Sequence, residues 1–150
     1  MADRFSQTVL TFLRRAGWQE GRKVSQFLIS IPGLSLFAKA QEVLTEFGGL
    51  HIGEYGPGLE CAASDVNLDP HLAIHLGPEL RNHESSNGLR LFPLGEVHRG
   101  HGYLIIDEND HLYLLSDELT PYSNSFVDGL EALLLGKRAP LKDKASKCEK

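Results

Sequence analysis

The sequence predicts an α+β fold, in which helices pack on a mostly antiparallel β-sheet within a single domain. Helical spacing of apolar residues is concentrated near the start of the chain and returns once near its end. Short apolar runs typical of strands fill the middle, an order that favours α+β over alternating βαβ units. A length of 150 residues with 41% hydrophobic and 23% charged residues suits one soluble domain with a sizeable core.

The N-terminal region contains one clear helical pattern and one ambiguous segment. Apolar spacing predicts a helix over about 4–16, with Asp3 as its cap and Gly17 as its end. Trp18, the only tryptophan, follows at once and is expected to be a core anchor. Segment 24–31 has helical spacing but contains β-branched residues, so a short helix and a strand both remain open.

Three further helices have recognisable ends. The cleanest apolar stripe covers 36–47, with Ser35 as its cap and a Gly-Gly pair at its end. A proline start predicts a short helix over about 78–85. The last helix begins after Ser125, which has capping-box spacing, and ends at Gly136.

The central element of the predicted sheet is a hairpin formed by two apolar runs, 103–106 and 112–115. The polar residues 107–111 between them are typical of a turn. Because neither run alternates strictly between apolar and polar residues, we expect both strands to be covered on both faces and to lie inside the sheet.

The remaining predicted strands come before this hairpin in the chain. Alternation predicts a strand over 50–55, followed by a Gly-Pro-Gly turn, with 59–63 as its hairpin partner. A third strand is expected over 89–94, and 72–76 is either a short strand or a turn. Segment 117–124 is expected to be a polar loop.

Charge is distributed unevenly along the chain, whose net charge is −5. Residues 1–136 contain nine basic and eighteen acidic residues, a net charge of −9, whereas 137–150 contain six basic and two acidic residues, a net charge of +4. We expect a folded domain over 1–136 and a mobile basic tail over 137–150. An acidic body repels nucleic acid and favours a basic partner.

Acidic residues are densest between Glu96 and Glu131, a stretch with eight carboxylates and only one basic residue, Arg99. Carboxylates next to each other on a hairpin turn are normally solvated, so we expect several of these side chains to face a partner. The candidate partner-binding residues are Glu96, Asp107, Glu108, Asp110, Asp117 and Glu118.

Patterns that would indicate an enzyme are missing from the sequence. The chain lacks Gly-x-Ser-x-Gly, and its glycine-rich stretch 53–58 lacks the lysine of a phosphate-binding loop. His98 and His101 have spacing that can ligate a metal in a loop, with Glu96 as a third ligand. No second paired motif supports such a site, so we predict no catalytic residue, no metal and no cofactor.

Cysteine usage and hydropathy bear on localisation. Cys61 and Cys148 lie far apart in the sequence, and two free thiols would fit a reducing cytoplasm, with a disulfide between them as the alternative. No apolar run approaches the roughly 20 residues of a membrane span, and the N-terminus does not have the pattern of a secretory signal. We therefore expect a cytoplasmic protein without a membrane or nucleic-acid partner.

An ordered set of short motifs resembles the SUKH superfamily of bacterial immunity proteins, and within it the third subgroup. The motifs extend over about 5–136. They are Gly17-Trp18 with Gly21-Arg22, Phe47-Gly48-Gly49-Leu50, Asp69-Pro70-His71-Leu72-Ala73, Pro93-Leu94-Gly95-Glu96, Gly102-Tyr103-Leu104-Ile105-Ile106-Asp107 with Leu112-Tyr113, and Gly129-Leu130-Glu131-Ala132-Leu133-Leu134-Leu135-Gly136.

The resemblance implies a single α+β domain that is cytoplasmic and non-catalytic. It also implies that the protein binds and neutralises a cognate toxin, often a nuclease or a deaminase, from neighbouring bacteria. The hairpin turn departs from the family pattern, because Asn109-Asp110 stands where such hairpins often have a glycine. Asn and Asp also tolerate this turn geometry, so the departure leaves the expected fold unchanged.

Two other classes of function remain open from the sequence. One is a small-ligand or peptide-binding regulator that uses a concave sheet face with Trp18 or Tyr113. The other is a metal-dependent hydrolase built on His98, His101 and Glu96.

Overall fold

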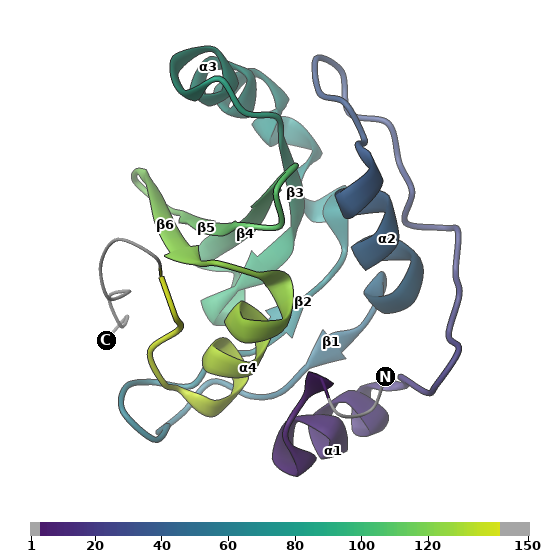
Figure 1. Cartoon of the computed structure of the whole chain (residues 1–150), viewed down its shortest axis with the longest axis vertical. Coiled ribbons are helices and arrows are strands. Elements are labelled where there is room, and N and C mark those ends of the chain that lie inside the picture. The colour runs from purple at the N-terminus through teal and green to yellow at the C-terminus, as the bar shows by residue number, and fades with distance from the viewer. Residues whose placement is uncertain (1–3, 142–150) are drawn as a thin grey trace.

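The protein, represented by a computed structural model that describes residues 4–141, is built on one six-stranded antiparallel sheet (Figure 1). The strands pair in chain order, β1-β2-β3-β4-β5-β6, so each pairs only with its neighbours in sequence. Their bounds are β1 His51–Ile52, β2 Val66–Asn67, β3 Leu91–Val97, β4 Gly102–Asp107, β5 Leu112–Leu115 and β6 Leu119–Ser123. The predicted hairpin is β4–β5, and it is central in the part of the sheet with long strands.

Helices cover both faces of this sheet. They are α1 Gln7–Ala16, α2 Ala38–Phe47, α3 Gly77–Asn87 and α4 Phe126–Leu135, with the 3₁₀ segments η2 Pro70–Leu76 and η3 His98–Gly100. Helices α1, α2 and α4 pack on one face, whereas η2 and α3 pack on the other (Figure 1). The prediction of an α+β fold with helices on an antiparallel sheet is confirmed.

Strand alternation divides the core into two clusters. Leu104 and Ile106 of β4 point into the larger cluster with α1, α2 and α4. Ile105, between them, points into the smaller cluster beneath η2 and α3. Because both faces are covered, nearly every β3 and β4 residue is buried, which explains the unbroken apolar runs in the sequence.

The glycines predicted to end helices are better matched by the structure than the residues predicted to cap helix starts. Gly17 and Gly136 end α1 and α4 in the left-handed conformation, and Ser125 caps α4 by accepting from the Asp128 backbone. Helix α1 begins later than predicted, because Ser6 caps it by accepting from the Val9 backbone. Likewise α2 begins at Ala38, and Ser35 does not cap it.

Several other segments differ from the prediction. Segment 24–31 forms neither a helix nor a strand, although Ile31 is buried, and it lies across the α2 end with Phe27 against Gly48 and Gly49. Segment 72–76 belongs to η2 and is therefore 3₁₀ helix. Within 117–124, five residues form the edge strand β6, because they pair with β5 despite Pro121.

The predicted hairpin between 50–55 and 59–63 is also wrong. Strand β1 pairs with β2, while the 53–65 loop between them has only the bridge between Gly56 and Ala63. Cys61 in this loop is disulfide-bonded, so the expectation of a free thiol at this position is wrong. The only other cysteine in the sequence, Cys148, lies outside the described residues.

The first residues beyond α4 pack against the domain. Ala139 is buried in the larger cluster, and the Asn124 N–H donates to the Pro140 carbonyl at 3.0 Å. The Arg138 N–H donates to Oε1 of Glu60 at 2.8 Å. Most of the predicted mobile tail, 142–150, lies outside the described residues.

Candidate partner-binding surface

The β4–β5 turn binds its own carboxylate instead of presenting it to solvent. Asp107 is fully buried, at 0% exposure. Its Oδ1 accepts from the backbone N–H groups of Asn109 at 2.8 Å and His111 at 3.0 Å, and its Oδ2 accepts from the Tyr113 hydroxyl at 2.8 Å. The expectation that this carboxylate is solvated is therefore wrong, and Asp107 acts as an internal brace of the turn.

The same contacts change the chemistry of Tyr113. Burial raises the pKa of its phenol well above the usual value, and the hydrogen bond to the Asp107 carboxylate raises it further. The phenol stays protonated and keeps donating to Asp107 across the physiological pH range.

The two remaining acids of this turn also make structural contacts. Asp110 has the left-handed conformation expected at the turn, with a φ of 73°. Its Oδ1 accepts from the Phe126 N–H at 3.0 Å, and its Oδ2 lies 3.8 Å from Nζ of Lys39. Burial raises the pKa of Asp110, although these two partners oppose that rise. Glu108 is exposed, and its Oε2 accepts from the Arg90 N–H at 3.2 Å.

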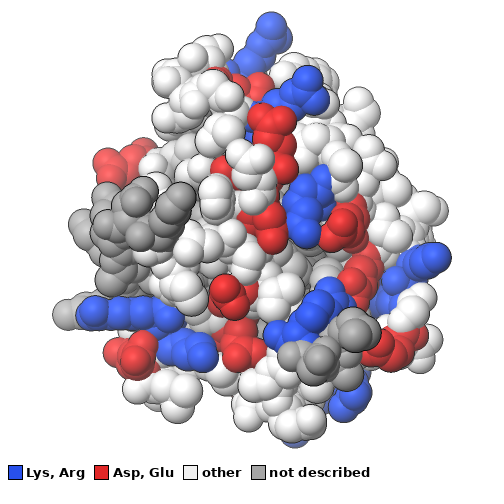
Figure 2. Space-filling view, viewed as in Figure 1, with Lys and Arg blue, Asp and Glu red and all other residues white. Residues whose placement is uncertain are grey.

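The other three predicted residues lie at the opposite end of the sheet. Glu96 pairs with Tyr103, and Tyr103 pairs with Leu115, which directly precedes the β5–β6 turn containing Asp117 and Glu118. The six residues of β4 separate the two ends by roughly 17 Å at about 3.4 Å per residue. The six predicted residues therefore do not form one patch, and Figure 2 shows acidic side chains in separate groups with basic ones between them.

The η3 end, as we name this second end, comprises the 53–65 loop, η3 and the β5–β6 turn 116–118. Glu96 on β3 is half-buried beneath it, whereas Asp117 and Glu118 are exposed. Within residues 4–141, neither of these two exposed carboxylates makes a side-chain hydrogen bond or ion pair. They are therefore available to a partner.

His98 of η3 and His101, directly after η3, take part in hydrogen bonds to neighbouring groups of the protein. The His98 N–H donates to Oγ of Ser64 at 2.8 Å, and Nδ1 of His101 lies 2.8 Å from the His98 carbonyl. In the part of the chain that the structure describes, no group of three or more His, Cys, Asp or Glu side chains could hold a metal ion. The structure does not bring His98, His101 and Glu96 together as such a site.

The two aromatic residues considered for ligand binding also have internal roles. Trp18 is 3% exposed, and its Nε1 donates to Oε2 of Glu46 at 3.0 Å. The Tyr113 hydroxyl is bound to Asp107. The expectation of Trp18 as a core anchor is confirmed.

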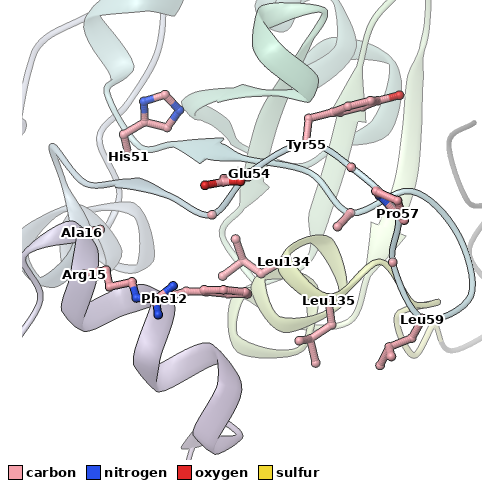
Figure 3. Close-up of a pocket in the computed structure, with 14 residues that line it drawn as sticks. Phe12, Arg15, Ala16, His51, Glu54, Tyr55, Pro57, Leu59, Leu134 and Leu135 are labelled. Atoms are coloured by element: carbon pink, nitrogen blue, oxygen red, sulfur yellow. The ribbon is translucent and has the colours of Figure 1, made fainter.

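The 53–65 loop borders a groove that the sequence analysis missed. The groove has a volume of about 660 Å³ and lies between α1, the residues after β1 and the end of α4 (Figure 3). Two large apolar side chains of the loop are exposed, Leu59 at 73% and Tyr55 at 36%. The leucine that directly follows the Gly-Pro-Gly turn is the available signal in the sequence, although its position also fits a strand.

Contacts with η3 connect this groove to the rest of the η3 end. The Arg99 guanidinium lies 4.6 Å from the Tyr55 ring centroid, and the His98 ring meets the same tyrosine edge-on at 6.2 Å. Asp65 accepts from the Arg99 N–H at 2.9 Å and from Nε2 of His51 at 2.9 Å. Partial burial pushes the pKa of Asp65 upward, but these hydrogen bonds outweigh it and hold the pKa below its usual value.

Comparison with known proteins gives one family. The chain matches the family model described as SUKH-3 immunity protein over residues 5–136. No curated protein and no solved structure gives a significant match. Within residues 4–141, no helix is both long and apolar enough to cross a membrane. Since the match spans nearly the whole described domain, the chain belongs to the SUKH-3 immunity protein family.

Proposed function

We propose that this protein is a cytoplasmic, non-catalytic inhibitor that binds and neutralises a cognate toxin domain, a nuclease or a deaminase. The observation that carries the proposal is the family match over 5–136, a region in which acidic residues greatly outnumber basic ones. A toxin that acts on nucleic acid needs a basic surface to hold phosphates. Carboxylates of the inhibitor can occupy that surface and accelerate association.

The acidic contact surface in this proposal is the η3 end of the sheet. Asp117 and Glu118 are exposed there, and Glu96 lies two strands away at the same end of the sheet. Glu108 and Asp110, at the far tip, contribute long-range attraction instead of direct contact, because each already binds a group of the protein itself. Asp107 is withdrawn from the surface because it is buried.

The proposal is tested by co-expression with candidate toxin domains, taken from the genes that neighbour the gene for this chain. Wild-type protein is expected to restore growth to cells that make the toxin and to form a stable complex with a catalytically inactive form of it. Normal growth arrest in the presence of wild-type protein, together with no complex in vitro, would exclude the inhibitor role.

A second candidate is a regulator that binds a small ligand, and the groove of about 660 Å³ is the observation that favours it. Pockets for drug-sized ligands have volumes of about 300–1,000 Å³. A rise in melting temperature with a small metabolite, in the absence of any protein partner, would support the regulator over the inhibitor.

A further inference from the structure

The most exposed large apolar side chain among the described residues belongs to a loop that is fixed in place. Leu59 is 73% exposed, yet its N–H donates to the Leu135 carbonyl at 3.0 Å. The N–H groups of Glu60 and Cys61 both donate to the Gly136 carbonyl, at 2.7 and 2.9 Å. Because three consecutive backbone N–H groups, from Leu59 to Cys61, are bonded to the end of α4, the loop presents Leu59 in one position.

Close packing also fixes the loop. A Cβ added at Gly58 would lie 2.5 Å from Cα of Gly136 and 2.8 Å from the Leu135 carbonyl oxygen. The two backbones therefore cross at a distance that only glycine allows. A partner that binds here does not have to order a mobile loop, so the entropic cost of binding is reduced.

The groove beside this loop has an apolar centre and a charged rim. Phe12, Leu134 and Leu135 line its interior, while Arg15 of α1 and Glu54 of the loop lie on opposite walls (Figure 3). Within residues 4–141, neither Arg15 nor Glu54 makes a side-chain hydrogen bond or ion pair. An apolar centre with a rim of both charges is the usual composition of a protein–protein contact.

The groove is continuous with the proposed acidic surface. Tyr55 at its edge contacts His98 and Arg99 of η3. His98 and His101 in turn share a second cavity, of about 210 Å³, with Glu118 of the β5–β6 turn. One surface therefore runs from Leu59 through η3 to the exposed carboxylates, and an occupant of the carboxylate region also reaches the groove.

We propose that this groove is the apolar anchor point of the toxin-binding surface, an inference that rests on the inhibitor role proposed above. Its occupant is a surface segment of the basic toxin domain. That segment places a nonpolar side chain against Leu59 and Tyr55 and a lysine or arginine against Glu54. Apolar anchors at the centre of a contact contribute most of its affinity, while rim carboxylates govern approach and register.

The test measures the dissociation constant for a catalytically inactive form of the toxin domain that the co-expression experiment identifies. Leu59→Asp and Leu59→Asn, together with Tyr55→Ser, are expected to weaken binding by about 30-fold or more. The matched control is Ile74→Asp, which alters an exposed apolar side chain of η2, 41% exposed, and should leave affinity unchanged. Melting temperatures should stay near wild type in the two Leu59 variants, because the Leu59 side chain is largely exposed.

Each outcome separates the inference from the proposed function. If the wild-type protein binds the toxin domain and both Leu59 variants bind it with the same affinity, the anchor is overturned and the inhibitor role is left intact. Loss of affinity only in Glu118→Lys would do the same and would place the contact elsewhere on the η3 end. Absence of binding by the wild-type protein would overturn both.

Discussion

The two ends of the sheet treat polar and apolar side chains in opposite ways. At the β4–β5 turn, the carboxylate of Asp107 is buried and satisfies three donors of the turn itself. At the η3 end, Leu59 and Tyr55 face solvent although the loop that carries them is firmly bonded. The acidic residues in the sequence mark both ends equally, with three candidates at each, whereas the geometry favours the second end.

The largest expected effect breaks the brace at the β4–β5 turn. Asp107→Ala leaves two backbone N–H groups and the Tyr113 hydroxyl without their acceptor. Buried donors without partners cost about 1–3 kcal/mol each, and partial relaxation brings our expected loss to about 3 kcal/mol. Urea unfolding monitored by circular dichroism measures this loss.

Glu108→Ala is the matched control for that variant, because it removes the neighbouring but exposed carboxylate. It should change the free energy of unfolding by less than about 0.5 kcal/mol. Equal losses of unfolding free energy in the two variants would show that the buried Asp107 stabilises the turn no more than the exposed Glu108. The contrast between the two ends of the sheet would then fail.

The next effect concerns the rigidity of the η3 end. Gly58→Ala forces a Cβ against Cα of Gly136 at 2.5 Å, so we expect a loss of about 2 kcal/mol and faster hydrogen exchange at Glu60 and Cys61. Gly56→Ala in the same loop meets no atom within 4 Å and should be nearly neutral. Similar stability of the two variants would mean that the loop moves freely against α4.

A smaller effect compares the two groups of acids in toxin binding. Glu118→Lys should slow association with the inactive toxin domain roughly threefold at low salt, because it reverses a charge on the proposed contact surface. Glu108→Lys, at the far tip, should slow it less. The two rates are compared by stopped-flow mixing at two salt concentrations, and a larger effect at Glu108 would return the site to the β4–β5 turn.

The smallest effect is a pH dependence at the η3 end. Because the folded protein lowers the pKa of Asp65 below its ordinary 3.8, the stabilisation from this group is present above that pH. It is lost as the pH falls below 3.8 and through the lowered value. In Asp65→Asn, stability should fall less steeply between about pH 4 and pH 2, by under about 1 kcal/mol in total. A curve parallel to that of the wild type would contradict the assignment.

Sequence patterns predict those elements whose ends are set by residues close to them in the chain. The β4–β5 hairpin and the end of α4 follow from apolar runs, a serine cap and a glycine. Strand β6 was missed because its residues become a strand only by pairing with β5, and Pro121 suggests otherwise. Segment 24–31 has helical spacing, but Leu28, Ile29 and Ile31 pack on the core without regular structure.

The site was harder to predict because side-chain direction depends on distant contacts. Asp107 and Glu108 are equivalent as adjacent carboxylates in the sequence, and only the fold buries one and exposes the other. The 53–65 loop takes its shape from bonds to Leu135 and Gly136, more than seventy residues away. No local sequence pattern reveals a contact between segments so far apart, so the groove cannot be predicted from the sequence.

The walls of the groove come from opposite ends of the chain. Phe12 and Arg15 come from the first helix and Leu134 and Leu135 from the last, whereas the sheet between them pairs strictly along the chain. Strands β3 to β6 are joined by short turns and can pair as they leave the ribosome, since the entropic cost of closing a loop grows with its length. The groove is completed only after α4 has emerged, so a nascent chain that stops before residue 126 lacks Leu134 and Leu135 and has no finished anchor for its target.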